Sequence, residues 1–157
     1  MTWRLRRATS DDLAAIMALE DSIYPDDAWS AENMARELTG EHTYYLVALG
    51  GDDAIDAYAG LLAPIGTGQG DIQTITVAPR ARRHGLARTM MLALINEARR
   101  RGAEELFLEV RVDNEPAQAL YRELGFETVS VRKRYYKGGI DALSMRLRVP
   151  EPRTGLA

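Results

Sequence analysis

The chain has 157 residues, of which 46% are hydrophobic and 27% charged, and its formal net charge is −3 at pH 7. These proportions are ordinary for one globular domain with a hydrophobic core. No apolar run approaches the roughly 20 residues of a transmembrane helix, and charged residues interrupt any signal-peptide core near the N-terminus. The absence of cysteine excludes disulfides, thiolate metal sites and an acyl-cysteine intermediate. We therefore expect a cytoplasmic protein that has no membrane segment.

The first half of the chain predicts three strands and two helices. Ser10 and Ser30 are the predicted N-caps of the helices, because serine side chains accept hydrogen bonds from the free amides of a first turn. The second helix ends near Leu38. The alternating or continuous apolar patterns predict strands at residues 3–8, 43–49 and 56–63. A Gly-Gly-Asp-Asp run between the last two predicts a hairpin.

The second half predicts a strand–helix–strand unit followed by a shorter helix and two strands. The predicted strands are residues 71–77, 106–111, 127–132 and 142–148, and the predicted helices are residues 83–101 and a segment from Pro116 to Gly125. The resulting order, βααβββαβαββ, favours an α/β fold in which a mixed sheet has helices on both faces. We expect a single domain over residues 1–149 and a disordered tail over residues 150–157.

The segment Arg82–Ala87 begins a predicted helix directly after a predicted strand. A glycine-bearing turn at a helix start presents free backbone N–H groups at the positive end of the helix dipole, where a phosphate or pyrophosphate binds. A helix start with a glycine for close packing explains the same pattern. The competing glycine run at residues 66–70 is followed by a strand rather than a helix, so it does not fit a dinucleotide loop.

The chain resembles the GNAT superfamily of acyl-CoA N-acyltransferases. Within it, the chain is most similar to the RimI-type enzymes that acetylate the N-terminal alanine of a ribosomal protein. The matching runs cover about half of the chain in the order of the family; they are residues 74–79, 82–87, 106–111, Asn114, 119–126 and 132–136. The Leu-Glu-Val-Arg and Arg-x-x-Tyr-Tyr runs distinguish RimI-type proteins from other GNAT proteins.

The resemblance implies acetyl-CoA as the cosubstrate. It implies that the backbone of Ile75, Thr76 and Val77 pairs with the pantetheine arm, with a bulge there that aims an N–H at the thioester oxygen. The amides implied to hold the pyrophosphate are those of Arg83, His84, Gly85, Leu86, Ala87 and Arg88. Ala87 stands where the family more often has glycine. Asn114 is implied to contact the cofactor, and it is also a predicted helix cap.

The resemblance also implies the catalytic residues. Glu109 corresponds to the general base that removes a proton from the acceptor amine, although a surface glutamate on a strand has the same local pattern. Tyr121 corresponds to the general acid for the leaving thiolate, although its helical spacing is also that of a core residue. Tyr135 and Tyr136 correspond to a loop on the substrate side. The two histidines form no metal-ligand pattern, so we expect no metal.

The uneven charge distribution agrees with these expectations. Residues 10–56 contain twelve Asp or Glu and one Arg, whereas residues 80–101 contain seven Arg and one Glu. An acidic half favours a cationic substrate and a basic segment an anionic cofactor, although solvated helix faces explain any single charge. The function that the resemblance implies is acetylation of a protein N-terminus, with the N-terminal alanine of a ribosomal protein as acceptor.

Two other functions are compatible with the same residues. The first is a GNAT enzyme that acetylates lysine side chains or a small amine, and the second is a non-catalytic regulator that binds acyl-CoA. The presence of both Glu109 and Tyr121 disfavours the regulator. We expect no nucleic acid as a partner, because the arginine-rich segment lacks interleaved aromatic residues, and no membrane, because no apolar run is long enough to span one. A monomer or a weak dimer is expected.

Overall fold

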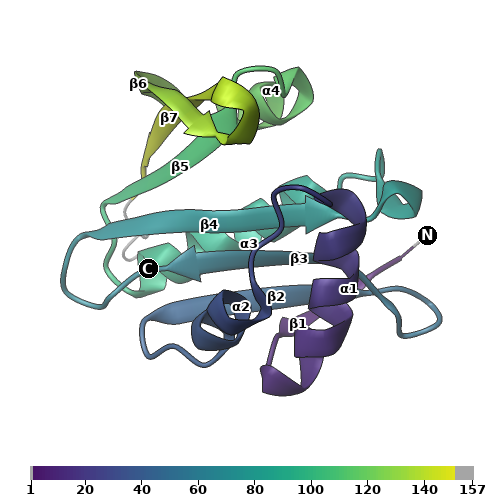
Figure 1. Ribbon diagram of the computed structural model, residues 1–157. Coiled ribbons are helices and arrows are strands. Elements are labelled where there is room, and N and C mark those ends of the chain that lie inside the picture. The colour runs from purple at the N-terminus through teal and green to yellow at the C-terminus, as the bar shows by residue number, and fades with distance from the viewer. Residues whose placement is uncertain (1, 151–157) are drawn as a thin grey trace.

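Residues 2–150 are described here from a computed structural model of the chain. Seven strands form one sheet in the order β1-β2-β3-β4-β5-β7-β6. The strands are β1 (Arg4–Arg7), β2 (Thr43–Leu49), β3 (Ile55–Leu62), β4 (Gln69–Val77), β5 (Glu105–Arg111), β6 (Glu127–Tyr136) and β7 (Ile140–Arg148). Neighbouring strands are antiparallel except β4 and β5, which are parallel. The predicted mixed sheet is confirmed (Figure 1).

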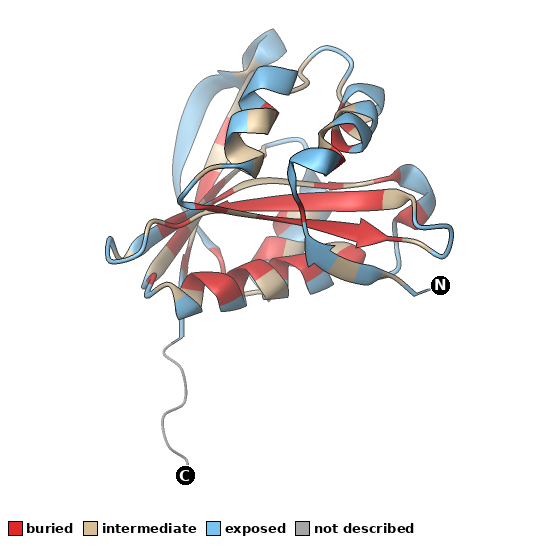
Figure 2. Cartoon of the chain, turned by 90° about the horizontal axis from the view of Figure 1, so that it is seen from below, coloured by how far each residue is buried: buried red, intermediate tan, exposed pale blue. Residues whose placement is uncertain are grey.

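Four α-helices cover the two faces of the sheet: α1 (Leu13–Ile23), α2 (Ala31–Leu38), α3 (Leu86–Arg100) and α4 (Glu115–Glu123). Residues of α1 and α2 share one core with Tyr45, Val47 and Tyr58, while residues of α3 and α4 share a second core with Leu46 and Ala48. Successive β2 residues therefore alternate between the two cores, as the side-chain period of a strand requires. Figure 2 shows the helices on both sides of the buried strands.

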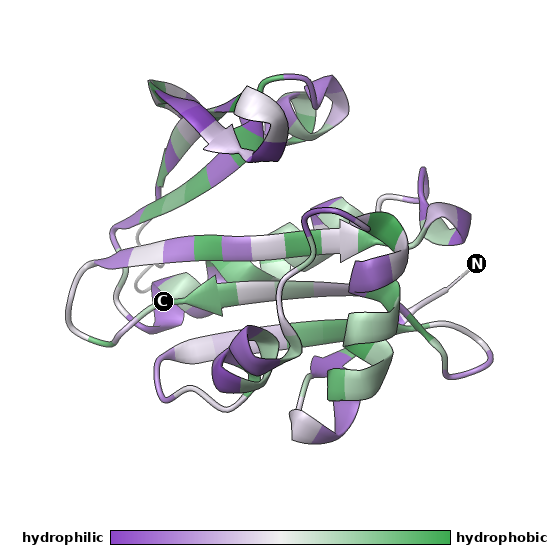
Figure 3. Ribbon diagram, in the orientation of Figure 1, coloured by the Kyte–Doolittle hydropathy of each residue, from purple (hydrophilic) through white to green (hydrophobic). Residues whose placement is uncertain are grey.

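The outer elements carry the polar residues. In α2 only Met34 is buried, and Figure 3 shows this helix as largely hydrophilic. The edge strand β6 has exposed side chains along nearly its whole length. Within residues 2–150, no helix combines the length and the apolar character needed to cross a membrane. The tail predicted at residues 150–157 lies, apart from Pro150, outside the described residues.

Several predicted boundaries are wrong for local reasons. The first helix is preceded by a 3-10 turn whose cap is Thr9 rather than Ser10, since Thr9 and Asp12 form a reciprocal capping box. The predicted Ser30 cap is confirmed, because its side chain accepts a hydrogen bond from the Asn33 amide at 3.0 Å. Helix α3 begins at Leu86 rather than at residue 83, because Arg83 and Gly85 have φ values of 66° and 77°, which a right-handed helix excludes.

Strands β4 and β5 pair only at their first residues and then diverge. Their register covers Gln69–Asp71 against Glu105–Phe107, and beyond it β5 pairs only with β7 (Figure 1). Gln73 bulges out of the β3–β4 ladder, since Ile72 and Thr74 pair with the adjacent residues Leu61 and Gly60. A bulge bends and twists its strand, and this bend leaves one edge of β4 without a neighbouring strand. This divergence creates the site described next.

Candidate active site

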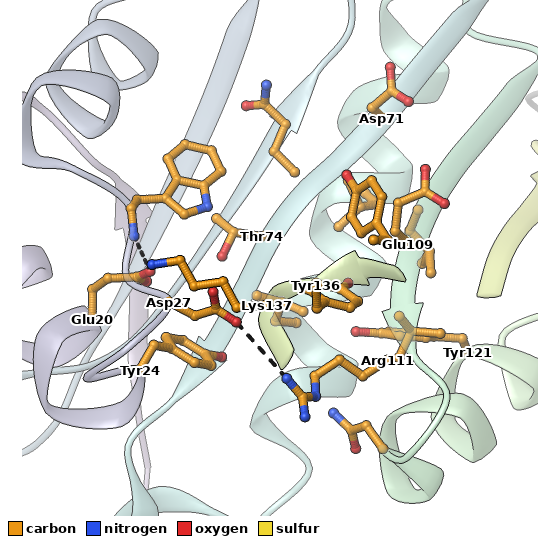
Figure 4. A pocket seen from close by; sticks show the side chains of 18 residues that line it. Glu20, Tyr24, Asp27, Asp71, Thr74, Glu109, Arg111, Tyr121, Tyr136 and Lys137 are labelled. Atoms are coloured by element: carbon orange, nitrogen blue, oxygen red, sulfur yellow. Dashed lines mark hydrogen bonds and ion pairs between the residues drawn. The ribbon is translucent and has the colours of Figure 1, made fainter. Parts of the chain in front are cut away.

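A cleft of about 630 Å³ opens where β4 and β5 separate. Its walls come from distant parts of the chain: Glu20, Tyr24, Asp27 and Trp29, residues 71–75 of β4, residues 108–111 of β5, Asn114 and Tyr121, and residues 135–137. Figure 4 shows Glu109, Tyr121 and Tyr136 on one side of the cleft and Glu20, Tyr24 and Asp27 on the other. The cleft therefore brings together both predicted catalytic residues, Ile75, Asn114 and both predicted substrate-side tyrosines.

Glu109 is placed by the alternation of β5. Leu108 and Val110 point into the core, so Glu109 lies on the opposite face, toward the cleft. Its carboxylate accepts a hydrogen bond from the Ser144 hydroxyl across the β5–β7 pair, and the Arg132 Nε lies 3.7 Å from the same oxygen. A donor and a guanidinium from two neighbouring strands thus fix the orientation of this carboxylate.

Tyr121 reaches the cleft from the buried side of α4. Tyr121 is 7% exposed, and the centre of its ring lies 6.0 Å from the centre of the Phe126 ring. Burial raises the pKa of its phenol well above the ordinary value, and the neighbouring Tyr24 and Tyr136 act in the same direction. The tyrosine also lines the cleft. The phenol is therefore a protonated donor at the cleft.

Asn114 caps α4 and also lies at the cleft. Its Oδ1 accepts a hydrogen bond from the Ala117 amide at 3.2 Å, which caps α4, and its side chain also lines the cleft. The cap fixes the start of the helix that carries Tyr121. The predicted cap is confirmed.

The predicted cofactor segment of β4 differs in detail from the prediction. Ile75 lines the cleft, whereas Thr76 is 3% exposed and its hydroxyl lies 3.2 Å from that of Tyr24. The carbonyl of Val77 accepts a hydrogen bond from Arg82 Nε at 3.1 Å. The bulge predicted within residues 75–77 lies instead at Gln73, whose Oε1 accepts a hydrogen bond from the Tyr45 hydroxyl at 2.6 Å. The divergent edge of β4 still offers backbone groups that no β5 residue pairs with.

The helix start at residues 83–88 lies beyond the carboxyl end of β4 and does not line the cleft. The first hydrogen bond of α3 runs from the Thr89 amide to the Gly85 carbonyl at 3.0 Å, so the amides of Leu86, Ala87 and Arg88 precede the helical ladder. A methyl group added at Gly85 would meet no atom within 4 Å. Packing therefore does not explain this glycine, whereas its positive φ does.

Tyr135 and Tyr136 end β6, beside the cleft. Their rings meet edge to face at 5.0 Å, and the Arg111 guanidinium lies 5.6 Å from the Tyr136 ring centre. Burial raises the pKa of Tyr136 to about 12, and the negative charge of Glu109 is among the lesser causes. The strand continues to these tyrosines, past the predicted end at residue 132, because β6 and β7 pair again at Tyr136 and Ile140 after an irregular stretch.

Several acidic and basic residues of the cleft were not predicted. Asp71 is the last β4 residue paired with β5, and its pKa is raised because burial disfavours its charge and Glu109 lies nearby. Lys137 donates a hydrogen bond to the Asp26 carbonyl at 2.9 Å, and Arg111 lies 4.0 Å from the Asp27 carboxylate. These contacts join residues far apart in sequence, so no local pattern could have indicated them. Asp71, at the start of a predicted strand, resembled an ordinary surface residue.

Comparison with known proteins agrees with this geometry. The sequence matches the acetyltransferase (GNAT) family over residues 13–126. The chain belongs to the GNAT family. As a GNAT protein it is an acetyltransferase, which confirms the predicted family and enzyme class.

Three similar proteins relate the GNAT fold to particular enzymes. N-alpha-acetyltransferase RimI of Mycobacterium tuberculosis is 36% identical over 92% of this chain and 91% of its own. The ribosomal-protein-S18-alanine N-acetyltransferase of Escherichia coli superposes with a TM-score of 0.85 at 28% identity, over 99% of both chains. A GNAT superfamily phosphinothricin acetyltransferase of Sinorhizobium meliloti, solved in complex with AcCoA, has a TM-score of 0.79 at 25% identity, over 99% of this chain and 95% of that one.

Proposed function

We propose that this GNAT acetyltransferase moves an acetyl group from acetyl-CoA to the α-amine of a protein, with the N-terminal alanine of a ribosomal protein as acceptor. The observation that carries the proposal is that Glu109 and Tyr121 line one cleft between the diverging strands β4 and β5. A carboxylate and a neutral phenol are the base and the acid that amine acetylation needs. The similarity to RimI and to the ribosomal-protein S18 enzyme supports this acceptor. Such an acceptor would place the reaction in the cytoplasm.

The described residues fit acetyl-CoA at two places. The edge of β4 that β5 leaves free, at Ile75 to Val77, offers backbone N–H and C=O groups to the pantetheine amides, except the Val77 carbonyl, which accepts a hydrogen bond from Arg82 Nε. In the proposal, the backbone N–H groups at residues 83–88 bind the pyrophosphate, and the open space at Gly85 lets this anion approach the backbone. Asn114 would contact the pantetheine arm from the start of α4. Acetyl-CoA supplies the activated acyl group.

Each proton in the proposed transfer has a group to receive or supply it. A free α-amine has a pKa of about 8 and is largely protonated at neutral pH, so it loses one proton through Glu109 to solvent before it attacks. Glu109 then takes the second proton, which the nitrogen loses as the amide forms, and solvent later returns a proton to Tyr121. The C–N bond forms as the C–S bond breaks. Tyr121, kept protonated by its burial, donates a proton to the departing sulfur. Both groups need no change of side-chain position to reach the cleft.

The acceptor end of the cleft favours a cationic amine. Four acidic residues, Glu20, Asp27, Asp71 and Glu109, line the cleft together with two basic ones, Arg111 and Lys137, and the Arg111 guanidinium lies beside the carboxylates of Asp27 and Asp113. The excess of negative charge attracts a protein N-terminus in its ammonium form. In the proposal, Tyr135 and Tyr136 contact the first residues of the acceptor.

A thiol-release assay with acetyl-CoA and a panel of peptides tests the proposal. The panel should vary the first residue, with alanine as reference, and include N-terminally blocked copies that retain a lysine. We expect release with free N-termini and none with blocked ones. Equal activity on blocked lysine peptides would contradict the α-amine assignment, and binding of acetyl-CoA without turnover on any amine would contradict the enzymatic one.

A further inference from the structure

A buried carboxylate lies at the end of the β2–β3 hairpin, away from the cleft residues. Asp56 is 2% exposed. Its Oδ2 accepts a hydrogen bond from the Trp3 indole N–H at 2.8 Å. Its Oδ1 lies 2.7 Å from Nε and 2.5 Å from Nη2 of the Arg80 guanidinium. Burying a charge is unfavourable unless it is paired and hydrogen-bonded. All of the donors to this carboxylate come from segments outside its own strand.

These donors hold the loop that leads into α3, residues 78–85. Arg80 lies in the 3-10 turn of that loop, and the Ala78 amide donates a hydrogen bond to the Asp56 carbonyl at 2.7 Å. Trp3, held by the same carboxylate, has its ring centre 5.3 Å from that of His84, at the far end of the loop. Asp56 therefore contacts the loop directly at its start and through Trp3 at its end.

The hairpin leaves space for this carboxylate. A Cβ added at Gly50 would lie 2.6 Å from the Asp56 Oδ2, closer than real Cβ atoms approach. Gly50 is not one of the residues with a positive φ, so its backbone conformation does not require glycine. It is the position of the Asp56 carboxylate that requires glycine at residue 50. A side chain at residue 50 would push this group away from Trp3 and Arg80.

The loop itself needs to be held in place. Arg83 has a φ of 66°, a left-handed conformation that side-chain-bearing residues rarely adopt, and Gly85 follows with a φ of 77°. We infer that Asp56 is a positioning residue that fixes loop 78–85, so that the amides at residues 83–88 face the pyrophosphate of acetyl-CoA. This inference rests on the proposed function, in which those amides bind the pyrophosphate.

Two acyl donors separate this role from a general effect on the fold. S-acetylpantetheine carries the same thioester and arm as acetyl-CoA but no pyrophosphate. For Asp56→Asn we expect the KM for acetyl-CoA to rise about tenfold, equivalent to about 1.4 kcal/mol, with kcat within about twofold of the wild type. With S-acetylpantetheine the two proteins should agree in kcat/KM within about twofold.

Asp53→Asn is the matched control. It makes the same substitution in the same hairpin, where the Asp53 side chain is 75% exposed and pairs with Arg4 at 3.2 Å. We expect this variant to match the wild type with both donors. An equal loss for Asp56→Asn with both donors, or no change with acetyl-CoA, would overturn the inference.

Two milder variants keep the test decisive if Asp56→Asn does not fold. Trp3→Phe removes the indole donor but keeps a ring beside His84, and Arg80→Gln removes the guanidinium from an exposed position. Each should raise the KM for acetyl-CoA by about threefold and leave the kcat/KM for S-acetylpantetheine unchanged. Equal effects on both donors would overturn the inference. Should the wild type acetylate no amine, the proposed function fails, and calorimetric CoA affinities of the same variants, compared with pantetheine, still test the inference.

Discussion

The proposed acetyl-CoA site, which extends from the cleft to the start of α3, and the acceptor end of the cleft are built from different kinds of groups. The proposed acetyl-CoA end consists mainly of backbone: the unpaired edge of β4, the amides that precede the ladder of α3 and the open position of Gly85. The acceptor end consists of side chains from the α1–α2 segment and the end of β6. Changes at the first end should therefore act on the acyl donor, and changes at the second on the acceptor. Glu109 and Tyr121 lie between them and should affect the chemical step.

The largest effect is expected for Glu109→Gln. Glutamine keeps the size of the side chain and can still accept the Ser144 hydrogen bond, but it cannot take a proton. We expect kcat to fall about 10³-fold with little change in either KM, within the range of a lost general base. Steady-state kinetics with both substrates measure this.

Glu105→Gln is the control for that prediction. Glu105 is in the same strand, four residues earlier, and pairs with Arg146 at 3.5 Å without lining the cleft. A comparable fall of kcat in both variants would show that β5 is merely sensitive to lost charge, and the assignment of Glu109 as base would be wrong.

Tyr121→Phe should lower kcat about 10²-fold, because the sulfur would leave without a positioned proton donor. The ring and its contact with Phe126 remain, so the KM for acetyl-CoA should hold within about twofold. Tyr44→Phe provides the control, since Tyr44 packs beside Arg7 and Arg101 away from the cleft. Unchanged kcat in Tyr121→Phe would leave this tyrosine with a packing role only.

Gly85→Ala tests the backbone end of the comparison. We expect the KM for acetyl-CoA to rise about tenfold, because a methyl group enters the space through which the pyrophosphate approaches the amides. The positive φ adds strain of about 1–2 kcal/mol. Gly66→Ala carries the same strain, with a φ of 88° in the open β3–β4 loop, and is the matched control. If both variants lose the same stability and the same donor affinity, the effect comes from strain alone.

The same contrast explains how much could be predicted from the sequence. The order of elements, the helix start at residues 82–87 and the Asn114 cap follow from glycines, caps and apolar periods, which act over a few residues. Glu109 and Tyr121 were predicted by resemblance, since a strand glutamate and a helical tyrosine look like surface and core residues. The alternation of β5 and the burial of α4 place both at the cleft.

The remaining features depend on contacts that sequence spacing does not reveal. The bulge at Gln73 rather than at residues 75–77 depends on the register with β3. The Lys137–Asp26 contact joins residues 111 positions apart, and the Asp56 network joins three separate segments. The acceptor end is made almost entirely of such contacts, so it was the least predictable part of the site.

A smaller effect is expected for Asp27→Asn at the acceptor end. This change weakens the contact between Asp27 and Arg111, whose side chains are 31% and 39% exposed. The Asp27 carboxylate would also attract the ammonium group of the acceptor, and a partly exposed charge interaction contributes about 0.2–1 kcal/mol, so the KM for the acceptor peptide should rise about threefold and the KM for acetyl-CoA should not change. Asp26→Asn is the control, because only its backbone carbonyl contacts Lys137. If the KM for acetyl-CoA changed and the KM for the acceptor peptide did not, the division into a donor end and an acceptor end would be wrong.

The smallest effect is expected in the alkaline pH profile. An ordinary tyrosine has a pKa near 10, so a phenol acting as acid would be about half ionised at that pH. Burial raises the pKa of Tyr121, which means that the phenol stays protonated as the pH passes 10 and loses its proton only above that. With both substrates saturating, kcat should stay within about twofold between pH 8.5 and 10, while kcat/KM for the peptide rises up to the pKa of its amine, about 8. A fall of kcat centred near pH 10, with the protein still folded by circular dichroism, would show that the general acid has an ordinary pKa, which contradicts the assignment of the buried Tyr121 phenol to that role.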